Sequence, residues 1–343
     1  MDWTLLIYKT FFLFLILLVT LLVAMYSTYG ERKVAAYMQD RHGPNRAGPF
    51  GLLQPLADGL KMFMKEEIIP LTANKNLFIL GPSIAMTTAL LTGVVIPWGA
   101  TITIGGREFS MQVADLNIGI LYVFAMVSIG VYGIMIGGWA SNNKYALYGA
   151  IRAASQMISY ELAMGMSIIA LVLTTGSLSL HEIVEQQQGM HWNIFYQPLG
   201  FLVFFICALA ETNRAPFDLP ECETELIGGY HTEYSSMKLG FYLFAEYINM
   251  FISSAVMATL YFGGYNMPFI DHIGLSPNIV TILGTLFFFL KIFGFIFLFM
   301  WIRWTLPRFR YDQLMNLGWL GLIPLSIFNI LATGIYYYFT ELK

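Results

Sequence analysis

Charged residues are scarce in this chain of 343 residues. Only 11% are Asp, Glu, Lys or Arg, whereas 57% are hydrophobic. A typical soluble domain carries roughly 25% charged residues, so the chain has too little charge for a water-facing surface of normal size. The net charge of −3 comes without a basic cluster interleaved with aromatic residues, which argues against a nucleic-acid-binding protein. The composition predicts a polytopic membrane protein in contact with the lipid bilayer.

Cysteine is also nearly absent. Cys207 and Cys222 are the two cysteines, and they form neither a CxxC pair nor a Cys/His spacing typical of a metal site. The chain also lacks a P-loop, a GxGxxG after a strand, an HExxH and a GxSxG. We therefore expect no bound metal, iron–sulfur cluster or flavin in this chain, and no catalysis by a side-chain nucleophile.

Long apolar runs are present instead, and each is long enough for a helix of about 20 residues to cross the hydrocarbon core. Because lipid cannot satisfy an open strand edge, these runs must be helices. The predicted spans are 4–29, 76–97, 113–137, 149–175, 194–212, 237–262, 278–303 and 316–339. The sequence thus predicts an all-α protein with one membrane domain over residues 1–343.

Lysine and arginine indicate the orientation of these spans. They concentrate in the loops after the first, third, fifth and seventh spans, and the other side holds little beyond Lys9, Arg107 and Lys343. By the positive-inside rule the rich loops face the cytoplasm, so both termini are expected outside. The first apolar run lacks a basic start and a cleavage site, which favours an uncleaved helix.

An amphipathic helix is predicted over residues 49–66. Leu52 and Leu56 fall on its apolar face, and Asp58 and Lys61 on the opposite face. The segment is too polar to span the membrane. It could lie in the lipid headgroups or form a lid over an opening at the level of the lipid, and amphipathy alone does not choose.

The segment before this helix is rich in turn-forming residues. Arg32, Arg41 and Arg46 lie in a stretch punctuated by Gly and Pro, which predicts a rigid bend that holds them near the membrane face. The simpler alternative is that they are anchors that extend toward the headgroups.

Three ionisable residues fall inside predicted spans, where a charge is costly. Glu161, Glu246 and Lys291 are expected to face the bundle interior or an aqueous cavity, and such residues usually mark an ion or proton path. The alternative is a structural ion pair, and Lys291 is the weakest candidate for proton transfer.

Carboxylates also crowd the loop predicted over residues 211–236. Its members include Glu211, Asp218, Glu221, Glu223 and Glu225. Crowding couples their titrations, as a proton relay requires. A solvated acidic loop is the alternative, but the run is interrupted by proline, phenylalanine and leucine and directly follows a span, which favours a packed segment.

Four polar segments make the family recognisable. They read ERKVAAYMQDRHGPNRAGPFGLLQPLADGLKMFMKE, SNNKYALYGAIRAASQMISYELAMG, ETNRAPFDLPECETELIGGYHTEYSSMKLGFYLFAEY and RWTLPRFRYDQLM. Over essentially its whole length the chain resembles the membrane subunit at the base of the peripheral arm of NADH:quinone oxidoreductase (respiratory complex I), known in bacteria as the H subunit. The HTEY after GGY is more similar to bacterial than to mitochondrial members.

This resemblance implies eight helices, both termini outside, and a quinone tunnel whose entrance is walled by the first helix, the amphipathic helix and the sixth helix. The implied quinone-binding residues are Arg32, Arg41, Arg46, Leu52, Leu56, Asp58, Lys61 and Phe217. The implied proton relay is Glu161, Glu211, Asp218, Glu221, Glu223, Glu225 and Glu246. The resemblance also implies partner chains that carry flavin and iron–sulfur clusters, antiporter-like membrane partners, and a place in the bacterial cytoplasmic membrane.

The chain departs from the family pattern in two places. Cys222 and Thr224 stand where relatives often have smaller residues, and the end of the third span, Ile134–Trp139, lacks the carboxylate expected there. Three other functions stay open: the equivalent subunit of a membrane-bound hydrogenase or formate-linked complex, a stand-alone ion transporter, and a docking platform without a relay. The GPNRAGPFG and ETNRAPFDLPE segments favour the quinone enzyme, and the absence of an internal repeat disfavours the transporter.

Overall fold

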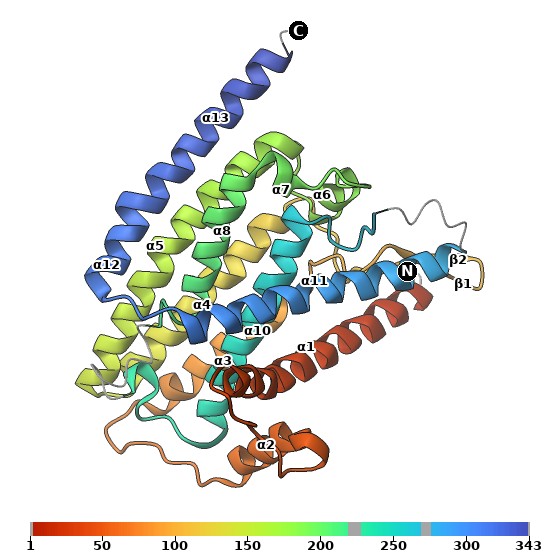
Figure 1. The fold of residues 1–343 in the computed structure, drawn as a ribbon. Coiled ribbons are helices and arrows are strands. Elements are labelled where there is room, and N and C mark those ends of the chain that lie inside the picture. The colour runs from red at the N-terminus through yellow and green to blue at the C-terminus, as the bar shows by residue number, and fades with distance from the viewer. Residues whose placement is uncertain (1–2, 219–227, 269–275, 342–343) are drawn as a thin grey trace.

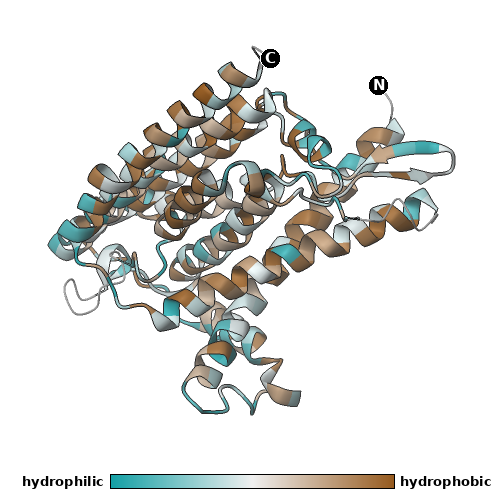
Figure 2. Ribbon diagram, turned by 45° about the horizontal axis from the view of Figure 1, so that its top comes forward, coloured by the Kyte–Doolittle hydropathy of each residue, from teal (hydrophilic) through white to brown (hydrophobic). Residues whose placement is uncertain are grey.

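The computed structural model describes residues 3–218, 228–268 and 276–341 and is mostly helical (Figure 1). Six helical segments are long and apolar enough to cross a membrane: α1 (Trp3–Met38), α4 (Gly119–Ala140), α5 (Lys144–Thr175), α10 (Ser236–Tyr261), α11 (Pro277–Thr305) and the run Tyr311–Thr340. Hydrophobic residues cover these helices, and hydrophilic residues gather at their ends and in the connections (Figure 2). The prediction of a helical membrane protein is therefore confirmed in this coarser form.

Two helices that coincide with the other predicted spans are shorter. These are α3 (Lys75–Thr92) and α8 (Pro198–Glu211), the latter preceded by the single turn α7 (Asn193–Tyr196). The run predicted over 194–212 is divided at Gln197 because Pro198 has no backbone N–H to donate and so begins a new helix. The length and apolarity of the described helices thus support six spans, and the count of eight remains a prediction.

The remaining elements are short. They are η1 (Pro49–Gly51), α2 (Gln54–Met64), β1 (Thr101–Ile104), β2 (Arg107–Ser110), α6 (Leu180–Gln186), η2 (Gly229–His231), α12 (Tyr311–Asn316), the π-helical turn η4 (Leu317–Leu322) and α13 (Ile323–Glu341). Helix α2 lies within the range predicted for the amphipathic helix. The hairpin β1–β2 was not predicted. Its turn is Gly105–Gly106, both at positive φ, and this backbone suits the right-handed twist of a tight hairpin.

Helices α3, α4 and α10 pack very closely because glycines face one another. A Cβ atom on Gly133 of α4 would lie 2.9 Å from the backbone of Ala85, and one on Gly81 would lie 2.9 Å from Gly137. The Tyr242 hydroxyl donates to the Gly133 carbonyl over 3.0 Å. Small residues at this spacing let membrane helices approach closely, and here they bring α10 against the middle of the bundle.

The chain after α8 is fixed to the bundle by a buried amide. Gln156 Nε2 of α5 donates to the carbonyls of Ala210 and Phe217 at 2.7 and 2.6 Å. The Phe309 N–H donates to the Pro216 carbonyl over 3.1 Å and ties the same loop to the chain after α11. Residues 212–218 are thereby held between α5 and the segment that leads into α12.

Candidate functional site

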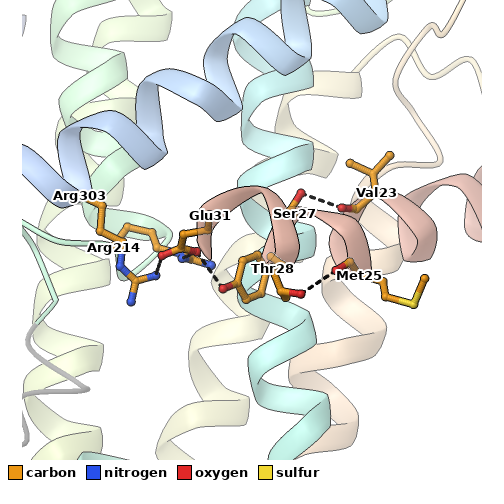
Figure 3. Close-up of polar contacts among 8 residues, drawn as sticks. Val23, Met25, Ser27, Thr28, Glu31, Arg214 and Arg303 are labelled. Atoms are coloured by element: carbon orange, nitrogen blue, oxygen red, sulfur yellow. Dashed lines mark hydrogen bonds and ion pairs between the residues drawn. The ribbon is translucent and has the colours of Figure 1, made fainter. Parts of the chain in front are cut away.

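A buried carboxylate near the C-terminal end of α1 gathers residues from four parts of the chain. Glu31 Oε2 lies 2.7 Å from Arg214 Nη1, and Oε1 lies 2.5 Å from Arg303 Nη1 (Figure 3). The Tyr247 hydroxyl of α10 donates to Oε2 over 2.8 Å. We call Glu31, Arg214, Tyr247 and Arg303 the charge cluster.

Helix periodicity explains why Glu31 points inward. Thr20, Ala24, Ser27, Glu31 and Ala35 recur every three or four residues on α1 and are all buried. Residues at this spacing share one helix face. The small side chains before and after Glu31 let α1 lie close to its neighbours, so the carboxylate reaches the two guanidinium groups.

The four members of the charge cluster include two cations and one carboxylate. Only 3% of Arg214 is exposed, and its guanidinium lies 4.1 Å from the ring centroid of Tyr247. Burial alone would lower the pKa of Arg214, but the nearby Glu31 carboxylate outweighs it and the pKa is raised. Arg214 therefore stays charged, although its Nε and Nη2 have no hydrogen-bond partner among the described residues.

A cleft opens beside the charge cluster between α1, α2 and α10. Its walls combine apolar side chains with a few charged ones: Met25, Thr28, Arg32, Pro55, Asp58, Gly59, Lys61, Met62, Gly240, Leu243, Phe244 and Tyr247. Arg32 Nη1 lies 2.6 Å from Asp58 Oδ2, and Lys61 Nζ lies 4.0 Å from Asp58 Oδ1. Tyr247 belongs both to the cleft wall and to the charge cluster, so it connects them.

A second hollow lies deeper in the bundle and is lined by carboxylates. Glu211, Tyr230, Glu246 and Asn249 border one cavity, and Glu211 and Asn249 also border an adjoining one. We call the two together the acidic cavity. The Tyr230 hydroxyl donates to Glu246 Oε1 over 3.1 Å.

Glu161 lies half-buried beside this cavity. The Ser128 hydroxyl of α4 donates to its carboxylate, and its charge is close enough to act on Glu211. Four elements, α4, α5, α8 and α10, thus bring three of the predicted relay carboxylates into one neighbourhood.

Comparison with known proteins identifies the family. A family model described as NADH dehydrogenase matches residues 11–334. The chain is 72% identical to the H 1 subunit of NADH-quinone oxidoreductase from Cytophaga hutchinsonii over 95% of both chains. It is 64% identical to the H subunit of the same enzyme from Flavobacterium psychrophilum over 98% of both, and 62% identical to that from Flavobacterium johnsoniae over 97% of this chain and 96% of the relative.

The chain belongs to the NADH dehydrogenase family, among the H subunits of NADH-quinone oxidoreductase. The family predicted from the four polar segments is confirmed. So is the prediction that the chain is one subunit of an enzyme complex of the respiratory chain and not a complete enzyme.

The predicted quinone-binding residues of this family member fall into four groups. Arg32, Asp58 and Lys61 line the cleft. Leu52 and Leu56 are not among its lining residues and are 44% and 46% exposed.

Arg41 and Arg46 lie on the exposed loop before η1. The structure does not bring Phe217 to the cleft. Its side chain is buried between the rings of Tyr160 and Phe309, at centroid distances of 5.4 Å each.

The predicted relay residues are also divided. Glu211 and Glu246 line the acidic cavity, and Glu161 lies near Glu211. Asp218 is buried in the fixed loop after α8, where Arg308 Nη2 lies 3.1 Å from its Oδ2. Glu221, Glu223 and Glu225 lie outside the described residues.

Glu31 and Tyr247 were missed by sequence reasoning. Glu31 stands within ERK, so its neighbours Arg32 and Lys33 suggested a basic membrane anchor. The signal that could have found it is the stripe of small residues on α1, which continues through Glu31. Tyr247 directly follows Glu246 and was hidden beside a more conspicuous acidic residue.

Lys291 of α11 contacts backbone carbonyls. Its Nζ donates to the carbonyls of Phe262, Gly264 and Asn266 at 2.6, 2.7 and 3.1 Å. It also lies 4.4 Å from the ring centroid of Phe287. These contacts fix the turn after α10 and indicate a structural role for Lys291.

The described residues contain no group of three or more His, Cys, Asp or Glu side chains that could hold a metal ion. Their polar clusters are instead built from carboxylates, guanidinium groups, tyrosine hydroxyls and amides. Such groups can bind a polar head, balance charge and exchange protons.

Proposed function

We propose that this chain is the membrane subunit of a proton-translocating NADH:quinone oxidoreductase in the bacterial cytoplasmic membrane, and that it forms the lipid-facing part of the quinone tunnel. The observation that carries this proposal is the cleft between α1, α2 and α10. Its wall is apolar at Met25, Leu243 and Phe244 and charged at Arg32 and Asp58. An isoprenoid tail would bind to the apolar part at roughly 25 cal/mol per Å² of buried surface.

The proposed topology has eight spans and both termini outside. Helices α3 and α7–α8 would supply the two spans beyond the six long ones, with the carbonyls at the break near Gln197 satisfied inside protein. Helix α2 would lie at the membrane surface. Its Leu60, Phe63 and Met64 are 62%, 69% and 87% exposed and would face lipid or a neighbouring chain of the complex.

The proposed coupling begins where quinone reduction changes the charge beside the charge cluster. Electrons would arrive from an iron–sulfur cluster on a partner chain, as the family resemblance implies. The charge change would act on Asp218, Glu211, Glu161 and Glu246. Glu221, Glu223 and Glu225 are proposed members of the same relay, which antiporter-like partners would use to move protons.

Narrowing the cleft with a larger side chain tests whether quinone passes through it. Gly59 of α2 lines the cleft, and a Cβ atom there would meet nothing within 4 Å. Gly59→Leu should therefore fold normally but fill the cleft, and the KM for a long-chain quinone should rise about tenfold. Gly294→Leu is the matched control, because a Cβ atom on Gly294 of α11 also meets nothing and the residue is absent from the cleft wall. Equal KM values in the two variants would contradict the proposed path.

Co-purification distinguishes the alternatives. Flavin and iron–sulfur subunits with inhibitor-sensitive NADH:quinone reduction are expected in the native assembly. Hydrogenase or formate-linked subunits would instead assign this fold to that complex, and ion transport by the purified chain alone would indicate a transporter. A docking platform without a relay predicts that Glu161→Gln has no effect on turnover.

A further inference from the structure

Helix α2 borders the cleft but is held only weakly by apolar packing. It lies beyond the ends of α1 and α10, outside the bundle of long helices (Figure 1). Among its eleven residues, all of which the structure describes, Pro55 is the one that is buried. Burial of an amphipathic face usually provides most of the stability of a helix in a protein, and lipid on the exposed face would not fix the distance to α10. The position of α2 therefore depends on contacts at its two ends.

The N-terminal part of α2 is attached to α1. The Tyr29 hydroxyl donates to the Phe50 carbonyl over 2.7 Å, in the turn η1 that precedes α2. Asp58 of α2 accepts a hydrogen bond from Arg32 over 2.6 Å. Both donors belong to α1, so this part of α2 would follow α1 if the two sides of the cleft moved apart.

The C-terminal part of α2 is attached instead to the start of α10. The Ser236 hydroxyl donates to the carbonyl of Met62, a residue of the cleft wall, over 3.1 Å. Just beyond α2, the Ile68 N–H donates to the Ser235 hydroxyl over 3.0 Å. Ser236 makes its contact from a backbone φ of 57°, in a region that L residues rarely adopt. Such a conformation persists where the surrounding contacts require it, which indicates that the fold specifies this attachment.

An ion pair completes the attachment. The Lys238 ammonium contacts the Glu67 carboxylate, and 12% and 52% of the two side chains are exposed. The Lys238 ammonium also lies 5.5 Å from the ring centroid of Phe78 in α3. Residues 65–68 are all exposed, so polar contacts hold this part of the chain more than burial does. We call Ser235, Ser236 and Lys238, with their partners Met62, Glu67 and Ile68, the latch.

Lys238 lies on the far side of α10 from the cleft. At 3.6 residues per turn, it falls on the face opposite Gly240 and Tyr247, which line the cleft. The chain thus passes around the start of α10, with Met62 on the cleft side and Glu67 on the side of α3. A substitution of Lys238 changes no side chain of the cleft wall, so its effect on quinone would have to act through the position of α2.

We propose that Lys238 is a positioning residue for quinone entry, because the latch fixes the C-terminal end of α2 against α10 and so sets the width of the cleft. The inference rests on the proposed path of quinone through this cleft. A quinone tail contacts α2 at Met62 and α10 at Leu243 and Phe244 together only while the latch holds the two helices in place. Loss of the ion pair weakens that contact and leaves the carboxylates of the acidic cavity unchanged.

Kinetics of the intact reconstituted complex test the role of Lys238. Lys238→Met should raise KM for a long-chain quinone about fivefold, the factor that corresponds to a partly exposed ion pair, and leave kcat unchanged. Lys238→Arg keeps the charge and should keep the KM of the unmodified protein. Glu67→Gln should match Lys238→Met, and the double variant should raise KM no further, because both changes remove one interaction. Lys144→Met is the matched control, because Lys144 is exposed at the start of α5 and belongs neither to the latch nor to the cleft wall.

Hydrogen–deuterium exchange over residues 54–68 reports the latch without quinone. Exchange there should be faster in Lys238→Met and unchanged in Lys144→Met. Unchanged exchange and KM in Lys238→Met, a fall in kcat at constant KM, or faster exchange at constant KM while Gly59→Leu raises KM would each overturn the proposal. If exchange is faster but Gly59→Leu also leaves KM unchanged, the quinone path itself fails and the positioning role falls with it. Size-exclusion chromatography of each variant separates loss of the latch from loss of assembly.

Discussion

The charge cluster and the acidic cavity both hold buried carboxylates, but they hold them differently. Glu31 in the cluster contacts two guanidinium groups and a tyrosine hydroxyl. Glu161 and Glu211 at the acidic cavity have no cationic partner among the described residues, and Glu161 accepts a hydrogen bond from the neutral Ser128 hydroxyl.

This difference separates two tasks. A carboxylate that balances two cations stays ionised and fixes the geometry around it. Carboxylates that lie near one another without a hydrogen-bonded cation titrate together, since bringing a second charge close is costly. We therefore propose that the charge cluster acts as a fixed electrostatic wall beside the cleft, whereas the acidic cavity responds to a change in charge.

The largest effect is expected at the acidic cavity. Glu211→Gln removes the carboxylate that borders both of its hollows, so NADH:quinone turnover coupled to proton movement should fall more than tenfold while the complex still assembles. The measurement is proton uptake and NADH oxidation in proteoliposomes. Glu108→Gln, on the exposed hairpin, is the control and should behave as the unmodified protein. Normal pumping in Glu211→Gln would rule out the relay.

Breaking the charge cluster should act mainly on stability. Glu31→Gln leaves two buried cations without their carboxylate, and breaking a buried ion pair typically costs about 3–5 kcal/mol. A lower midpoint of thermal unfolding of the complex should result. The double variant Glu31→Gln with Arg303→Gln should recover part of this loss, because one unbalanced cation is removed. A double variant less stable than both single variants would show that Glu31 and Arg303 do not act as a pair.

The smallest effect on stability is expected in the cleft. Asp58 binds Arg32, whose side chain is 50% exposed, and exposed ion pairs contribute about 0–1 kcal/mol. Asp58→Asn should leave the unfolding midpoint nearly unchanged but alter the KM for quinone by a few fold. A stability loss as large as that of Glu31→Gln would show that Asp58 also fixes the wall beside the cleft. The cleft and the charge cluster would then not differ in this respect.

Much of the fold follows from hydropathy. The apolar runs give the six long helices, and the turn-rich segment before residue 54 ends where α2 begins. Local backbone chemistry explains where the observed helices differ from the predicted spans. Pro198 divides one predicted span, and the π-helical turn at Leu317–Leu322, which lies two residues before Pro324, interrupts another run. A window of hydropathy does not detect either break.

The site was harder to predict, because its members meet only in three dimensions. Arg32, Asp58 and Lys61 could be assigned to one opening through the family resemblance, and the structure brings them to one cleft. The resemblance also implied quinone binding by Phe217, but the structure does not bring it to this cleft, and its ring packs against Tyr160. Recognising Glu31 as a site residue required the row of buried residues on α1 together with two arginines that are distant in the sequence.

Steady-state kinetics with quinones of different tail length test the division of tasks most directly. Gly59→Leu and Glu211→Gln would be compared in the same reconstituted complex with a long-chain and a short-chain quinone. Gly59→Leu should raise KM for the long-chain quinone alone, whereas Glu211→Gln should lower kcat for both. A fall in kcat with unchanged KM in Gly59→Leu, or a KM effect of Glu211→Gln confined to the long-chain quinone, would contradict this division of tasks.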